Sequence, residues 1–87
     1  MLLDVVRVEA QPDYKLYLEF ENNERRVFDV SPYLEKGVFR QLKNHELFYR
    51  AHIGGGTVVW PGDIDIAPET LYDCSIPIAD TDSTKQA

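Results

Sequence analysis

Residues 54–72, GGGTVVWPGDIDIAPETLY, carry more structural information than any other stretch of the chain. The three glycines allow a tight reversal, because glycine adopts positive φ without steric cost. The β-branched and aromatic run Thr57–Trp60 then predicts a strand. Pro61-Gly62 suits the centre of a type II turn, and Pro68 suits the first turn of a helix. We therefore predict a hairpin, a turn and a helix from Pro68 to about Cys74 that hold the rest of the fold together.

Acidic and apolar residues alternate between the turn and the predicted helix. The segment Asp63–Ile66 has a period of two, so that one face can be apolar and the other acidic. Ala67 occupies the cap position of the helix, and Ile66 and Leu71 stand where a hydrophobic staple forms. The segment is thus expected to join the turn to the helix with its isoleucines on one side.

The first thirty residues predict an antiparallel meander of three strands with very short connections. The predicted strands are Leu3 to Ala10, Tyr14 to Phe20 and Arg25 to Val30. The second strand alternates strictly, with its apolar residues on one face, which is typical of a half-buried antiparallel strand. Gln11-Pro12-Asp13 and Asn22-Asn23 are the turn signals between the strands.

The first of these strands is apolar on both faces. One face holds Val6, Val8 and Ala10, and the other holds Leu3, Val5 and Arg7. This pattern predicts a strand inside a sheet, or one that is covered on both sides.

The middle of the chain predicts short helical turns. Ser31-Pro32 is typical of a helix start, and Gly37 can end that helix in the left-handed conformation. The expected elements are a turn over Pro32 to Lys36, a second over Val38 to Lys43, a connection over Asn44 to Leu47, and a strand over Phe48 to Ile53. That strand should pair with Thr57–Trp60.

Length and charge narrow the possible classes of protein. The chain has 87 residues and a formal net charge of −6. This predicts one α+β domain over 1–78 and a polar, disordered tail over 79–87. The negative charge argues against direct nucleic-acid binding.

A single cysteine, Cys74, favours a reducing compartment. The absence of a signal peptide and of a long apolar run predicts a cytoplasmic protein that does not cross a membrane.

These residues resemble the domain of unknown function 2442 family, a group of small, mostly bacterial proteins. The similar segments are the opening VxxVEAQPDYKLYLEFENNE, RVFDVSPYLEKGVFRQL, the phenylalanine in ELFYRA, and TVVWPGDIDIAPETLY. One departure is Asn22-Asn23, where the family usually has a glycine in the turn. The resemblance implies an α+β fold on an antiparallel sheet and no catalytic residues. It also implies the small partner of a two-gene cassette reminiscent of toxin–antitoxin pairs.

Several residue groups could in principle carry chemistry. The acidic cluster of Asp63, Asp65, Glu69 and Asp73 offers the oxygen ligands that Mg²⁺ and Ca²⁺ take. It lacks EF-hand spacing, however, and capping roles in the turn and helix explain it more simply. His45 and His52 have no further ligand at metal spacing and no nucleophile beside them, so surface or strand positions are expected. Cys74 is expected to be a buried, inert thiol.

Aromatic residues are the stronger candidates for a binding surface. Trp and Tyr anchor many protein interfaces because they bury a large area at low entropic cost. Trp60 and Tyr72 could shape a shallow pocket, with Tyr17 as a further contact. The alternative for Trp60 is a core residue in a small domain that is short of apolar mass.

We therefore predict a non-enzymatic protein-interaction module without cofactor or metal. Its candidate binding residues are Trp60, Asp63, Asp65, Tyr72 and Tyr17. A protein partner is expected, through this aromatic patch or by strand addition at a sheet edge, and self-association into a homodimer would use the same surface. The alternatives are a small metal-dependent enzyme that uses the acidic cluster, and a transcriptional accessory factor that acts through a DNA-binding partner.

Overall fold

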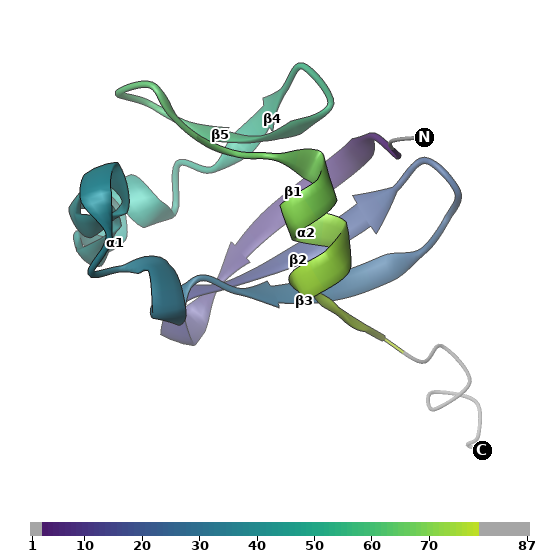
Figure 1. Ribbon diagram of the computed structural model, residues 1–87, viewed down its shortest axis with the longest axis horizontal. Coiled ribbons are helices and arrows are strands. Elements are labelled where there is room, and N and C mark those ends of the chain that lie inside the picture. The colour runs from purple at the N-terminus through teal and green to yellow at the C-terminus, as the bar shows by residue number, and fades with distance from the viewer. Residues whose placement is uncertain (1–2, 79–87) are drawn as a thin grey trace.

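Two antiparallel sheets form the protein, as a computed structural model that describes residues 3–78 shows (Figure 1). The four-stranded sheet has the order β1-β2-β3-β7, with β1 at Val5–Gln11, β2 at Lys15–Phe20, β3 at Arg25–Asp29 and β7 at Ile76–Pro77. The three-stranded sheet has the order β4-β5-β6, with β4 at His52–Gly54, β5 at Thr57–Trp60 and β6 at Ile64–Ile66. The helices are α1 at His45–Phe48 and α2 at Pro68–Cys74, and the 3-10 helices are η1 at Pro12–Tyr14, η2 at Ser31–Tyr33 and η3 at Gly37–Lys43. The predicted α+β class is confirmed.

The second and third strands form as their alternation predicts. In β2 the side chains of Leu16, Leu18 and Phe20 are buried, and Phe28 of β3 is buried beside them. Asn23 lies in the left-handed region with φ +72°, a conformation that asparagine tolerates better than most residues. The two-asparagine turn therefore closes the hairpin without a glycine.

The first strand differs from its prediction in two ways. It lies at the edge of the sheet, not inside it. Its register also shifts between Val5 and Arg7, so Val6 is 55% exposed. A bulge of this kind inserts one residue and reverses the alternation after it. Val5 is consequently buried on the same side as Val8 and Ala10, which pack against the core, although the sequence placed them on opposite faces.

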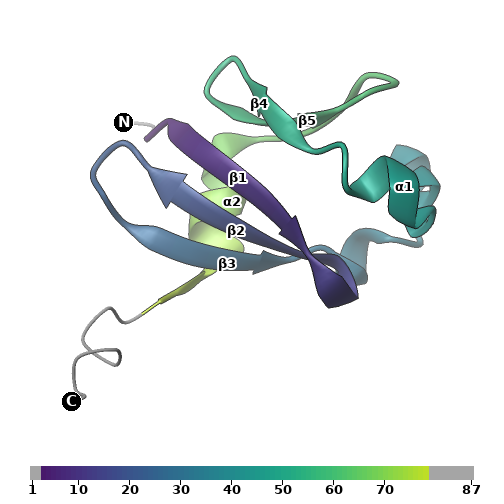
Figure 2. The same cartoon turned by 180° about the vertical axis from the view of Figure 1, so that it is seen from behind.

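The core lies between the inner face of the four-stranded sheet and residues 54–72. Helix α2 crosses one face of the β1–β3 meander, and the opposite face is turned toward the viewer in Figure 2 without a described helix over it. Ile66 and Leu71 are 5% and 0% exposed, which confirms the staple positions on either side of the Ala67 cap. At the same end of the three-stranded sheet, in the β4–β5 turn, Val5 N–H donates to the Gly56 carbonyl at 2.9 Å and ties the hairpin to β1.

The middle of the chain contains a helix that the sequence patterns did not predict. The expected connection over Asn44 to Leu47 is mostly α1, because the Asn44 side chain caps it by accepting a hydrogen bond from Glu46 N–H at 2.9 Å. The predicted strand over Phe48 to Ile53 was wrong in its first half. Phe48 belongs to the helix and its ring is buried, so β4 begins only at His52.

The C-terminal strand β7 was also not predicted. It adds two residues to the sheet, with Val27 paired to Ile76 and Arg26 paired to Pro77. The predicted tail over 79–87 lies outside the described residues. Within residues 3–78, none of the helices has the length and apolar character needed to cross a membrane.

Candidate functional site

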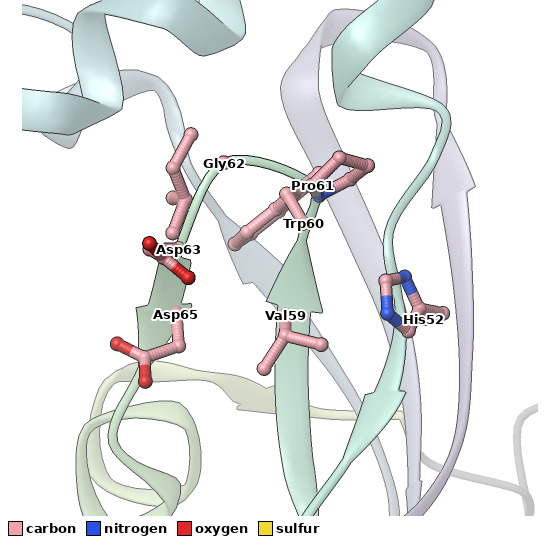
Figure 3. Close-up of a pocket in the computed structure, with 8 residues that line it drawn as sticks. His52, Val59, Trp60, Pro61, Gly62, Asp63 and Asp65 are labelled. Carbon is pink, nitrogen blue, oxygen red and sulfur yellow. The ribbon is translucent and has the colours of Figure 1, made fainter.

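A hollow of about 360 Å³ opens on the surface where the three-stranded sheet meets the Pro61-Gly62 turn (Figure 3). Its lining comes from β4, β5, the turn and β6, and consists of His52, Val59, Trp60, Pro61, Gly62, Asp63, Ile64 and Asp65. The carboxylates of Asp63 and Asp65 lie on one side, His52 lies on the other, and Val59 lies between them.

The sheet register places these side chains. His52 pairs with Val59, and Val59 pairs with Asp65, so the three residues form one row across the sheet. Ile64 and Ile66 on either side of Asp65 are buried, which leaves the aspartate on the outer face. Gly62 and Asp63 have φ values of +93° and +63°, and this tight turn brings Asp63 next to Asp65.

Trp60 is a core residue that also borders the hollow. Its side chain is 2% exposed and its ring stacks on Phe48 with centroids 6.3 Å apart. The indole N–H donates to the Phe48 carbonyl at 2.9 Å. The burial supports the core interpretation of Trp60. Trp60 therefore supports the wall of the hollow, and other residues supply most of the accessible area of the hollow.

The electrostatic character of the hollow comes from Asp63 and Asp65. Both residues are exposed, and neither carboxylate has a hydrogen bond or an ion pair with another described residue. On the opposite side, a ring nitrogen of His52 lies 3.0 Å from the Arg50 carbonyl, which orients the imidazole. The hollow thus combines an apolar floor with two carboxylates whose charge is not neutralised inside this part of the protein.

The two tyrosines among the candidate residues do not line the hollow. Tyr72 is half-buried on α2, where its hydroxyl donates to Glu24 at 2.8 Å and the Arg26 guanidinium lies 4.3 Å from its ring centroid. Tyr17 lies on the outer face of β2, and its hydroxyl donates to Glu19 at 2.7 Å. That hydrogen bond is the main reason why the pKa of Tyr17 is raised. The five candidates therefore belong to three different places.

The Tyr72–Glu24 contact should be detectable as a change in the pKa of Glu24. The hydrogen bond from Tyr72 is the largest cause that lowers the pKa of Glu24, and Arg26 adds to the effect. A carboxylate whose pKa is lowered by folding stabilises the folded state above its unfolded pKa, and this contribution is lost as the pH falls through the folded pKa. We expect carboxyl NMR titration to give a Glu24 pKa below the usual range for glutamate, and Tyr72→Phe to raise it. An unchanged Glu24 pKa in Tyr72→Phe would contradict the assignment.

The other candidate groups do not come together as a metal site. Within residues 3–78, no group of three or more His, Cys, Asp and Glu side chains is placed to hold a metal ion. His45 is exposed and its ring makes an edge contact with Tyr14. The prediction that Cys74 is buried was wrong, since the thiol is exposed. Ser75, which follows α2, is the buried residue at this end of the helix and is 6% exposed. Cys74 precedes it on the surface.

Sequence reasoning found the two aspartates but not their neighbours across the sheet. His52 and Val59 enter the hollow through strand pairing, and Pro61 enters it in the turn that follows β5. The period-two pattern of β5 and β6 could have indicated Val59, because it shares the outer face with Asp65. The expected surface or strand position of His52 is confirmed, since it is exposed at the start of β4, but its place opposite Asp65 was not predicted.

Comparison with known proteins agrees with the resemblance noted from the sequence. A family model described as "Protein of unknown function (DUF2442)" matches residues 5–77, which is most of the chain and includes all seven strands found in residues 3–78. No curated protein and no solved structure gives a significant match.

Proposed function

Because the chain belongs to the DUF2442 family of proteins of unknown function, we propose its role from its own surface. The role is that of a non-enzymatic protein-interaction domain. Its hollow binds a partner segment that places a Lys or Arg side chain between Asp63 and Asp65. An adjacent apolar side chain of that segment rests on Val59 and Pro61.

The observation that carries this proposal is the pair of unneutralised carboxylates beside an apolar floor. Two neighbouring negative charges repel each other, and a cationic side chain relieves that repulsion while it steers the partner to the hollow. The apolar floor adds contact area and removes water around the ion pair, which strengthens it. The net charge of −6 gives the whole domain the same preference for a basic partner.

The alternatives fit these observations less well. A hard cation is usually held by several oxygen ligands, and the described acidic residues do not form such a group. A transcriptional accessory role is compatible with the proposal, since a basic DNA-binding protein is one kind of partner that an acidic hollow would take. The family resemblance suggests that the neighbouring gene product, in the bacterial cytoplasm, is the first partner to test.

A peptide titration tests the hollow directly. We propose ¹⁵N-labelled protein titrated with two short peptides, one carrying a lysine beside a leucine and the other carrying a glutamate in place of the lysine. The lysine peptide should shift the amide signals of His52 and of residues 59–65, and added salt should weaken its binding. The double variant Asp63→Asn/Asp65→Asn should lower the affinity by about tenfold or more, which corresponds to about 1.4 kcal/mol.

A matched double variant controls for net charge. Asp13→Asn/Asp73→Asn removes two exposed carboxylates outside the hollow and should leave the affinity unchanged. Equal losses in the two double variants would mean that only the overall charge matters. Binding of the lysine peptide that shifts signals elsewhere, or no binding by either peptide, would refute the proposed use of the hollow.

A further inference from the structure

The outer face of the four-stranded sheet carries three parallel rows of side chains. Cross-strand pairing defines each row, because paired residues point to the same side of a sheet. The first row is Arg7, Glu19 and Arg25; the second is Glu9, Tyr17, Val27 and Ile76; the third is Gln11, Lys15 and Asp29. Figure 2 views the β1–β3 part of this face, and none of the described helices lies over it.

The middle row supplies an apolar stripe. Tyr17 and Val27 are half-buried by their neighbours, and Ile76 is 71% exposed at the end of the row. We call Tyr17, Val27 and Ile76 the central stripe. Charged residues of β2 and β3 flank the stripe on both sides. In each of these two strands, the residue on one side of the stripe is positive and the residue on the other side is negative. Along β2 the order is Lys15, Tyr17, Glu19, and along β3 it is Arg25, Val27, Asp29.

We infer that this face binds a second copy of the chain about a two-fold axis that runs along the central stripe. Such an axis exchanges the two charged rows, because it reverses the direction of the strands. Glu19 then faces Lys15 of the second copy, and Arg25 faces Asp29 of the second copy. The central stripe packs on itself. Each charged contact occurs twice, as an isologous interface requires.

Charge complementarity selects this axis over its alternative. A two-fold axis parallel to the strands and centred on β2 would place Lys15 on Lys15 and Glu19 on Glu19. It would also place Arg7 on Arg25, so like charges would meet in three of the four pairs of the flanking rows, and Gln11 would face Asp29 in the fourth. Like charges directly opposite one another destabilise an interface. Of these two axes, the one along the stripe brings opposite charges together.

The edge of the face does not oppose this arrangement. Glu9, which would approach its own copy, lies 3.4 Å from Arg7, and this ion pair compensates its charge. Arg7 also lies 3.6 Å from Glu19.

Two sheets that pack face to face keep their strands within about 30° of each other, and antiparallel stacking of β2 on β2 satisfies this geometry. The face is only four strands wide, so a weak dimer with less than about 1,200 Å² of total buried area is expected.

Sedimentation equilibrium with a charge-swap cycle tests the inference. The wild-type protein should dimerise weakly, with a dissociation constant in the micromolar range. Lys15→Glu places carboxylate against carboxylate twice in the dimer, and Glu19→Lys places ammonium against ammonium twice. Each single variant should raise the dissociation constant by about tenfold or more. The double variant Lys15→Glu/Glu19→Lys exchanges the charges and should recover most of the wild-type affinity.

An apolar pair of variants gives an independent measurement. Ile76→Ser should weaken the dimer, whereas Val38→Ser, at a residue that is 49% exposed on η3, should not. Circular dichroism checks that each variant is folded. A wild-type protein that stays monomeric throughout the micromolar range would overturn the inference. So would a dimer that neither single charge variant weakens, or one that the double variant fails to restore. These results are independent of peptide binding at the hollow.

Discussion

Replacing Trp60 with alanine should lower the free energy of unfolding by about 3–5 kcal/mol, the largest loss that we expect from any single substitution. The ring is 2% exposed and stacks on Phe48, so its removal leaves a large apolar cavity. It also leaves the Phe48 carbonyl without its donor. Small domains have about 5–15 kcal/mol of stability, so this loss is a large part of the total. Urea denaturation followed by circular dichroism measures it.

Trp60→Phe separates the contribution of the buried ring from that of the indole hydrogen bond. Phenylalanine keeps much of the apolar area but has no N–H group, so the loss should fall to about 1–3 kcal/mol. Because Trp60 supports the wall of the hollow, Trp60→Phe should also keep most of the peptide binding, provided that the protein is folded. A loss below about 1 kcal/mol in Trp60→Ala would show that the ring is not part of the core.

The second large effect should come from Arg26, whose side chain is only 12% exposed. Its Nε donates to Ser75 Oγ at 2.6 Å, and its two terminal nitrogens donate to the Ser75 carbonyl at 3.0 Å and to Glu24 at 2.9 Å. These contacts attach the end of α2 to β3. Arg26→Met keeps the apolar stem but leaves the Ser75 groups without a donor, so we expect a loss of about 2–3 kcal/mol. Glu24 is 37% exposed and can be hydrated, which keeps the loss below that of a fully buried pair.

Arg7 provides the control for the Arg26 variant. It also contacts two carboxylates, at 3.4 and 3.6 Å, but its side chain is 57% exposed. Exposed ion pairs contribute little because water solvates the separated charges almost as well. Arg7→Met should therefore change the free energy of unfolding by less than about 1 kcal/mol, measured at low protein concentration. Similar losses in Arg7→Met and Arg26→Met would contradict the role assigned to burial.

Much of the fold follows from local sequence patterns. The alternation of β2 and β3, the strand Thr57–Trp60 and the bounds of α2 were all predicted, because each has a strict period or a proline at its start. The errors occurred where the local signal was weak. Val6 has no special backbone signal, so the bulge that reverses β1 could not be seen. The capping role of Asn44 went unrecognised because α1 is only four residues long.

The candidate site was predicted less well than the fold. Asp63 and Asp65 share the hollow with Trp60 as the sequence suggested, but Tyr72 and Tyr17 do not. Proximity along the chain suggested that Tyr72 would lie beside Trp60. The helix instead turns that ring toward Glu24 and Arg26. One hydrogen bond to Glu24 and one cation–π contact with Arg26 hold it there.

The sequence by itself determined β2, β3, β5 and α2, and the apolar face of β2. Periodicity and the backbone limits of proline and glycine act within a few residues, and so they can be read locally. Only the tertiary structure decided that Trp60 is buried, that His52 and Asp65 face each other across Val59, and that the outer rows have complementary charges. These features depend on strand register and on the packing of residues far apart in the chain, and no local pattern specifies either one.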